Sequence, residues 1–229
     1  MSETKPLAII AGAGPGLGRA ICEKFTNAGY QVVALNRSLH DALPDTIELL
    51  QVELSDPTAV IEAFGHIEDK YGLPDVLVHN PADYLNQPFL QTQPDQFLSI
   101  WQSTTLSAAL LSQQAINRML RKGGGTIVLS GATASVKAAA EHSAFASAKF
   151  ALRGLAQSLA REFQNSGIHV CHVILDGVIL SDKNQQQDGT DDATMMRPED
   201  IAETYLSIAR QPRTTWTQEL DLRPINENF

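Results

Sequence analysis

Four glycines near the start of the chain could hold the phosphates of a nucleotide. They lie in "AGAGPGLGRA", after an apolar run that predicts a strand and before a predicted helix. Glycine lets the backbone turn sharply and approach a phosphate, and the amino end of a helix adds a favourable dipole. The spacing fits GxxxGxG rather than GxGxxG, because Leu17 stands where the second pattern needs glycine. The predicted dinucleotide-binding residues of this loop are Gly12, Gly14, Gly16, Leu17 and Gly18.

The end of the second predicted strand indicates which dinucleotide would bind. NAD-binding proteins usually place an acid there, which holds the ribose 2′-hydroxyl. This chain reads "ALNRS", so Asn36 and Arg37 occupy the place, and a guanidinium can pair with a 2′-phosphate. We therefore expect NADP(H) rather than NAD(H). The alternative is that Arg37 is an ordinary solvent-exposed arginine.

The elements that position these residues alternate along the chain. Amphipathic patterns predict helices between apolar runs that predict strands, and this order is typical of βαβ units with a parallel sheet covered on both faces. We expect an α/β, doubly wound, Rossmann-like sheet with three αβα layers, in a single domain over residues 1–229. The predicted strands are 7–12, 30–36, 46–54, 74–80, 123–130, 167–175 and 216–222, and the predicted helices are 16–28, 55–72, 94–122, 142–165 and 197–210.

Composition limits the partners of the protein. The chain has 229 residues, of which 43% are hydrophobic, and its net charge is -9. A negative surface repels phosphate backbones, so we expect no nucleic-acid partner. No apolar run approaches the length of a membrane span. Cys22 and Cys171 fit reduced core thiols, and we expect a cytoplasmic protein.

Two further stretches have competing interpretations. The polar segment 181–196 is either a disordered surface loop or a mobile loop over a substrate. The sequence "HVCH" contains residue types that bind metals, but on a strand His169 and Cys171 point to one face and His172 to the other. We therefore expect a core strand and no metal site.

Several motifs together resemble the short-chain dehydrogenase/reductase family over nearly the whole chain. They are the glycine loop, "VELSD", "HNPA", the pair Phe145 and Lys149, and "DGVILS". Within the family, the FxxxK spacing and the ending "WTQELDLRP" look most like a group of bacterial reductase-like proteins. The resemblance implies contacts to adenine and to the nicotinamide amide from a set of further residues. These are Glu53, Leu54, Asn80, Val178 and Ser181.

The resemblance also implies four catalytic positions, of which only Lys149 keeps its residue type. Thr104 stands where the family has Asn, Ala132 where it has Ser, and Phe145 where it has Tyr. A shift of the alignment by one or two residues would instead offer the hydroxyl of Ser130 or Thr133. The resemblance implies that Lys149 holds the nicotinamide ribose, and the alternative is a solvated helix lysine.

Phenylalanine keeps the ring of tyrosine but cannot donate a proton, and a positioned general acid is worth about 10²–10⁴ in rate. Tyr84, in the loop after the fourth strand, and His142, just before Phe145, are possible surrogate donors. We therefore keep two functions open: an NADP(H)-dependent oxidoreductase of a small carbonyl or alcohol, and an inactive NADP(H)-binding sensor or partner subunit. The family resemblance also implies a homodimer or homotetramer.

Overall fold

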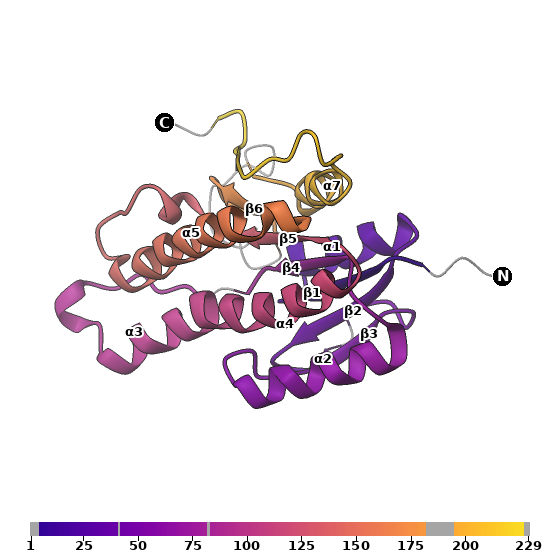
Figure 1. Cartoon of the computed structure of the whole chain (residues 1–229). Helices are drawn as coiled ribbons and strands as arrows, with labels where there is room; N and C mark the ends of the chain where they lie inside the picture. Colours follow the sequence, from indigo (N-terminus) through magenta and orange to yellow (C-terminus); the bar gives the residue numbers. More distant parts are fainter. Residues whose placement is uncertain (1–4, 41, 82, 182–194, 227–229) are drawn as a thin grey trace.

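The computed structural model of the chain describes residues 5–40, 42–81, 83–181 and 195–226. Seven parallel strands form one sheet in the order β3-β2-β1-β4-β5-β6-β7 (Figure 1). The predicted α/β, doubly wound fold is therefore confirmed. The strands are β1 (Leu7–Ala11), β2 (Gln31–Asn36), β3 (Glu48–Gln51), β4 (Val76–His79), β5 (Gly125–Ser130), β6 (Ile168–Leu175) and β7 (Glu219–Leu222).

Helices cover both faces of the sheet, as the alternating pattern requires. One face packs against α2, α4 and α5, and the other against α1 and α7. Alternate residues of one strand point to opposite faces, so Leu7 and Ile9 join the first cluster while Ala8 and Ile10 join the second. The α-helices are α1 (Leu17–Asn27), α2 (Pro57–Tyr71), α3 (Pro94–Trp101), α4 (Ser107–Arg121), α5 (Ser143–Phe163) and α7 (Pro198–Ala209).

The long helix predicted at 94–122 contains a wide turn that the sequence pattern does not reveal. A π-helical turn, η2 (Gln102–Leu106), separates α3 from α4. Such turns widen a helix locally and are frequent at functional sites. Thr104 is fully buried in this turn. The strands β3, β4 and β7 are also shorter than predicted.

The order of the strands creates a crevice beside β1. The chain moves outward from β1 to β3 and then returns to β4 on the other side of β1. Ligands of open α/β sheets bind outside the carboxyl ends of the strands at such a switch point. The residues after β1, β2 and β4 are therefore the first place to look for a site. Most of the predicted loop 181–196 lies outside the described residues, which include only Ser181, Met195 and Met196 of it.

Candidate active site

The glycine loop between β1 and α1 combines tight packing with open space. A Cβ atom on Gly12 would lie 2.6 Å from the backbone nitrogen of Pro81, and one on Gly18 would overlap the carbonyl oxygen of Gly12. Gly14 and Gly16 face open space instead, and Gly16 has a φ of +104° that other residues rarely adopt. Gly12 and Gly18 therefore allow close backbone packing, and Gly14 and Gly16 leave open space in front of the loop.

The amino end of α1 faces this open space. Gly16 caps the helix without a side-chain hydrogen bond, and the first turn contains no acidic residue. The positive end of the helix dipole is therefore not neutralised by its own first turn, which suits an anionic ligand.

A pocket of about 280 Å³ lies in front of the loop, at the crevice expected from the strand order. Its volume is close to the lower end of the range for small-ligand sites, about 300–1,000 Å³. It contains seven of the predicted cofactor residues: Gly12, Gly14, Asn36, Arg37, Glu53, Leu54 and Asn80. Pro81, Asp83 and Ser103 complete it and were not predicted. We call these ten residues the glycine-loop pocket.

Polar contacts hold the walls of the glycine-loop pocket. The Asn80 side-chain amide donates to the carbonyl oxygen of Gly12 over 3.2 Å, which joins the end of β4 to the loop. The Asn36 amide donates to the carbonyl oxygen of Ser38, and the Gln51 amide donates to that of Arg37. The backbone around Arg37 is therefore fixed, while its guanidinium stays exposed and pairs with Asp83.

Phe145 and Lys149 lie on one face of α5, as their spacing predicts. The Phe145 side chain packs against a small buried cluster that contains Ile100, and Leu85 and Phe97 pack against the same cluster. The Lys149 ammonium lies 5.7 Å from the centre of the same ring, within range of a cation–π contact.

Lys149 is only 3% exposed, so it is not the solvated helix lysine of the alternative interpretation. Its Nζ donates to the carbonyl oxygen of Ser130 over 2.8 Å. Burial lowers the pKa of Lys149 from its ordinary value to about 8, because removal from water disfavours the ammonium. The Lys149 ammonium thus lies beneath the carboxyl end of β5, where the Ser130 carbonyl oxygen accepts a hydrogen bond from it.

Tyr84 and His142, the two possible surrogate donors, lie together beside Phe145. The Tyr84 ring contacts the Phe145 ring edge to face, with centroids 5.2 Å apart. Its hydroxyl lies 2.8 Å from His142 Nε2. His142 Nδ1 is 2.7 Å from the carbonyl oxygen of Ala140, which can only accept, so Nδ1 carries a proton. In the neutral imidazole Nε2 is then the acceptor, and the Tyr84 hydroxyl donates to it.

The hydroxyls of Ser130, Thr133 and Thr104 are engaged or buried. Ser130 Oγ lies 2.8 Å from the hydroxyl of Tyr205, and both side chains are buried. Thr133 Oγ1 donates to Asp176 Oδ1 over 2.5 Å. Thr104 Oγ1 is buried and has no hydrogen-bond partner among the described residues. Tyr84, at 65% exposure, is therefore the phenol of this group that a solvent-borne molecule can reach.

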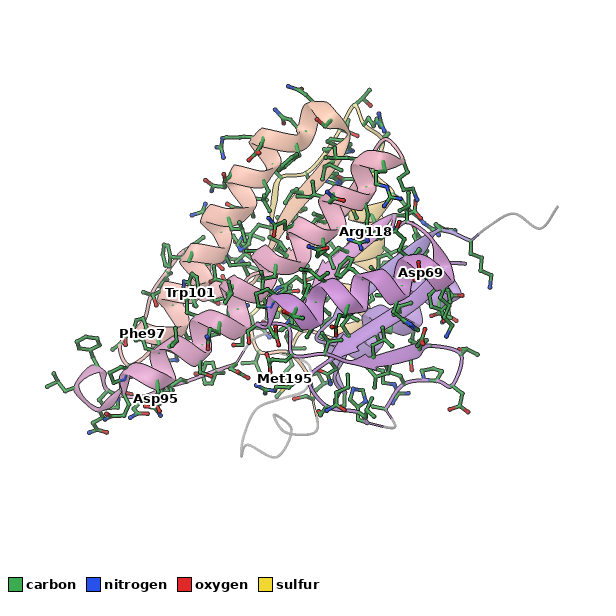
Figure 2. All side chains as sticks on the ribbon, turned by 60° about the horizontal axis from the view of Figure 1, so that its bottom comes forward. Asp69, Asp95, Phe97, Trp101, Arg118 and Met195 are labelled. Carbon is green, nitrogen blue, oxygen red and sulfur yellow. The ribbon has the colours of Figure 1, made fainter. Side chains whose placement is uncertain are left out.

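A second pocket, of about 700 Å³, opens at Tyr84 and shares Asp83 with the first. We call it the Tyr84 pocket, and it is lined by Asp83, Tyr84, Leu85, Asp95, Gln96, Ser99 and Ile100. Figure 2 shows Asp95, Phe97 and Trp101 along the projecting α3, whereas Asp69 of α2 lies at the opposite side of the molecule.

Comparison with known proteins identifies the family to which this arrangement belongs. The profile of the short chain dehydrogenase family matches residues 6–191, which is most of the chain. The chain belongs to this family. It is therefore an oxidoreductase of the short-chain dehydrogenase type.

Relatives of this short-chain dehydrogenase differ in function. A 3-oxoacyl-[acyl-carrier-protein] reductase of Salmonella typhimurium is 28% identical over 80% of this chain and 77% of its own. The structure of a short-chain dehydrogenase from Rhodopseudomonas palustris is 29% identical, with a TM-score of 0.82 over 97% of this chain and 99% of its own. A serine dehydrogenase complexed with NADP+ is 18% identical, with a TM-score of 0.86 over 97% and 96%.

Some predicted site residues of this short-chain dehydrogenase lie outside the two pockets. Leu17 is buried in the second core cluster, because it begins the apolar face of α1. Val178 is half exposed and Ser181 is partly buried, and neither lines a pocket described above. Ala132 follows β5 and donates its N–H to Ser135 Oγ over 3.1 Å.

Two histidines of the short-chain dehydrogenase are buried, of which sequence reasoning placed His172 on a core strand but missed His79. His79 ends β4, is fully buried, and its Nε2 lies 2.7 Å from Ser107 Oγ. His172 of β6 packs against Gly131, where a Cβ would overlap its imidazole. Burial lowers the pKa of His79 to about 3 and that of His172 to about 4. His79 is the first residue of "HNPA", so its place at the end of a predicted strand could have indicated that it is buried.

No group of three His, Cys, Asp or Glu side chains in the described part of the chain could hold a metal ion. Cys22 and Cys171 are free and buried, and burial raises the pKa of both thiols to about 12. Within residues 5–40, 42–81, 83–181 and 195–226, no helix is both long and apolar enough to cross a membrane.

Proposed function

We propose that the protein is an NADP(H)-dependent oxidoreductase that interconverts a small carbonyl compound and its alcohol. The observation that carries this proposal is the glycine-loop pocket, with its open glycine floor and Arg37 at its mouth. The residues present fit a dinucleotide, because Gly14 and Gly16 leave space that any side chain would fill. When bound, NADPH supplies a hydride, and with it two electrons, to a carbonyl carbon.

The preference for the phosphorylated dinucleotide rests on the end of β2. Asn36 replaces the usual acid, so no carboxylate of that strand repels a phosphate. The Arg37 guanidinium is exposed and can form two parallel hydrogen bonds to a phosphate. We assign the adenosine end of the cofactor to Asn36, Arg37, Glu53 and Leu54, and the diphosphate to the glycine loop.

Lys149 would hold the nicotinamide ribose, as the family resemblance implies. It is the one catalytic position that keeps its residue type in a chain with the FxxxK spacing. Its side chain already lies below the carboxyl end of β5, where Nζ donates to Ser130. We further assign Val178 and Ser181 to the segment that approaches the nicotinamide amide.

We propose that Tyr84 supplies the proton that the missing tyrosine would otherwise supply. Phe145 lacks a hydroxyl, and the Tyr84 phenol lies against its ring. Carbonyl reduction leaves a negative oxygen, which takes the Tyr84 proton as the new C–H bond forms. The hydrogen bond to His142 then provides a route by which the phenolate regains a proton from solvent.

The hydroxyls of Ser130, Thr133 and Thr104 are less suited to this role. Thr133 donates to Asp176, whose other carboxylate oxygen binds Arg223 over 2.8 Å, and Thr133 lines neither pocket. Ser130 and Tyr205 form a serine–tyrosine pair, but both are buried in the core. A group that is closed off from the pockets cannot reach a substrate oxygen.

The Tyr84 pocket is the substrate site in this proposal. Leu85 and Ile100 give it an apolar wall, and Asp83 and Asp95 give it negative charge. Two carboxylates disfavour an anionic substrate, so we propose a neutral or cationic carbonyl compound.

A second candidate function is a sensor or partner subunit that binds NADP(H) without turnover. The packing of Phe145 against the apolar cluster that contains Ile100 favours it, because an apolar side chain occupies the place of a donor. In either case we propose a homodimer or homotetramer, since Leu98, Trp101 and Phe150 expose apolar surface on α3 and α5. The buried free thiols suit a cytoplasmic location.

One experiment separates the two candidates. The protein is titrated with NADPH while nicotinamide fluorescence is followed, and NADPH oxidation is then measured with a panel of small aldehydes and ketones. Binding followed by turnover supports the oxidoreductase, and binding without turnover supports the sensor. Absence of NADPH binding would contradict both.

A further inference from the structure

An ion pair spans the mouth of the glycine-loop pocket. Arg37 follows β2 and Asp83 follows β4, on either side of β1. Both guanidinium nitrogens face the carboxylate, with Nη1–Oδ2 and Nη2–Oδ1 distances of 3.4 Å. The two side chains are 66% and 34% exposed. The pair therefore connects the two sides of the crevice but is long and accessible to water.

The contact is easily exchanged for another anion. Hydrogen bonds between a guanidinium and a carboxylate are usually 2.7–2.9 Å long, so this pair is a weak one. The Arg37 backbone is held by Gln51, so the guanidinium can move while its base stays in place. A phosphate that binds Arg37 must replace Asp83 as its partner, and Asp83 remains nearby as a like charge.

We propose that Asp83 sets the selectivity of the pocket between phosphorylated and unphosphorylated dinucleotides. It competes with the 2′-phosphate for Arg37 and repels that phosphate, so it restrains the affinity for NADPH. A 2′-hydroxyl carries no charge, and its binding does not require the ion pair to open. This inference rests on the proposed dinucleotide function and adds to it a residue that the sequence patterns did not indicate.

The test is the substitution Asp83→Asn, which keeps the shape of the side chain and removes its charge. Dissociation constants for NADPH and NADH are measured by nicotinamide fluorescence with the whole protein. We expect NADPH to bind about threefold to thirtyfold more tightly than to the wild type at low salt, and NADH to change by less than about twofold. The gain should shrink in 0.5 M salt, since salt screens exposed charges.

Asp69→Asn is the matched control, because it also removes one negative charge. Asp69 is exposed on α2, at the far side of the molecule from α3 (Figure 2). The control should leave both dissociation constants unchanged, and an equal gain in both variants would show a general charge effect and overturn the inference.

The remaining outcomes separate this inference from the proposed function. If the wild type binds NADPH but Asp83→Asn leaves the NADPH to NADH ratio unchanged, Asp83 does not set selectivity and the proposed function stands. If the variant loses NADH affinity alone, Asp83 binds the ribose and the inference is wrong. If neither dinucleotide binds the wild type, the proposed function fails, and the inference fails with it.

Discussion

The two ends of the candidate site carry their charges in opposite ways. In the glycine-loop pocket, Arg37 and Asp83 lie at the surface and form an ion pair that is accessible to water. Around β5 and α5, Lys149, His79 and His172 are almost fully buried. The first end relies on backbone shape, which glycines provide, and the second relies on individual side chains.

This difference suggests why one end can keep its role while the other changes. A dinucleotide is held largely by the backbone and the helix end, which tolerate many substitutions elsewhere. Proton transfer depends on one hydroxyl at one place, so under the proposed assignment Phe145 cannot carry it out. The proposed proton donation by Tyr84 is the part of this comparison that a single substitution tests most directly.

The substitution Tyr84→Phe should have the largest effect. If Tyr84 is the donor, kcat for carbonyl reduction should fall by about 10²–10⁴, because a positioned general acid is lost. The dissociation constant for NADPH should change by less than about threefold, since Tyr84 does not line the glycine-loop pocket. Stopped-flow measurement of NADPH oxidation, together with fluorescence titration, gives both numbers.

Tyr30→Phe is the control for this variant. Tyr30 precedes β2, at the amino ends of the strands, and packs against Phe25 away from both pockets. Its loss of a hydroxyl should leave kcat unchanged. An unchanged kcat in Tyr84→Phe as well would exclude Tyr84 as the donor.

The buried histidines should make the protein sensitive to acid. The pKa values of His79 and His172 are lowered to about 3 and about 4, so both stay neutral in the folded protein while unfolded chains become protonated below about pH 6.5. Stability is therefore lost as the pH falls through this range, by about 3 kcal/mol for each histidine by pH 4. Urea unfolding at pH 7, 5.5 and 4.5 measures the loss.

His172→Gln should flatten this dependence, because its own share of the proton uptake disappears. His66→Gln is the control, since His66 is an exposed residue of α2 beside Glu48. Parallel curves for wild type and His172→Gln would show that His172 is not held neutral in the folded state.

Lys149→Met should stabilise the protein while it weakens the site. The pKa of Lys149 is lowered to about 8, which means that burial of the ammonium destabilises the fold below that pH. The loss of its hydrogen bond to Ser130 offsets part of the gain, so we expect about 1–3 kcal/mol of added stability at pH 7. In the wild type, stability should rise as the pH increases from about 8 toward 10, as the native lysine loses its proton first.

The variant should lack this rise, and NADPH should bind less tightly to it. Lys137→Met, at an exposed position, is the control for the loss of one positive charge. A Lys149→Met protein that is less stable than the wild type at pH 7 would contradict the assigned cost of burial.

Sequence patterns predicted the parts of the molecule that depend on local chemistry. The alternation of apolar and amphipathic runs predicted all seven strands, and the glycine loop and "ALNRS" predicted most of the glycine-loop pocket. These features are predictable because a turn, a helix end and a strand terminus are determined by adjacent residues. The π-helical turn at Gln102–Leu106 was not predictable, since its residues fit an α-helical pattern equally well.

The contacts that sequence patterns could not predict join distant segments of the chain. Asp83 pairs with Arg37 across 46 positions, and Tyr84 meets His142 across 58. Neither contact follows from periodicity, because each depends on how a loop after β4 lies beside another element. The predicted contacts of Leu17, Val178 and Ser181 stay predictions for the same reason, since the segments that would bring them to a ligand are not fixed by local sequence.

The double substitution Phe145→Tyr with Ala132→Ser should have the smallest effect. It adds the hydroxyls that the family has, whereas Tyr84→Phe removes one. The new hydroxyls would stand where the family has its donor and its oxyanion partner, with the Lys149 ammonium 5.7 Å from the ring of residue 145. If Tyr84 already donates protons, a second donor adds little, and we expect a gain of about tenfold in kcat/KM. The double substitution is therefore also made in the Tyr84→Phe variant, where it should recover most of the lost kcat. Recovery in the Tyr84→Phe background, with little gain in the wild type, would mean that Tyr84 and a tyrosine at position 145 can each donate the same proton. No activity in any of these proteins, with NADPH affinity intact, would mean that the substrate does not lie beside Phe145 and that the sensor is the better description.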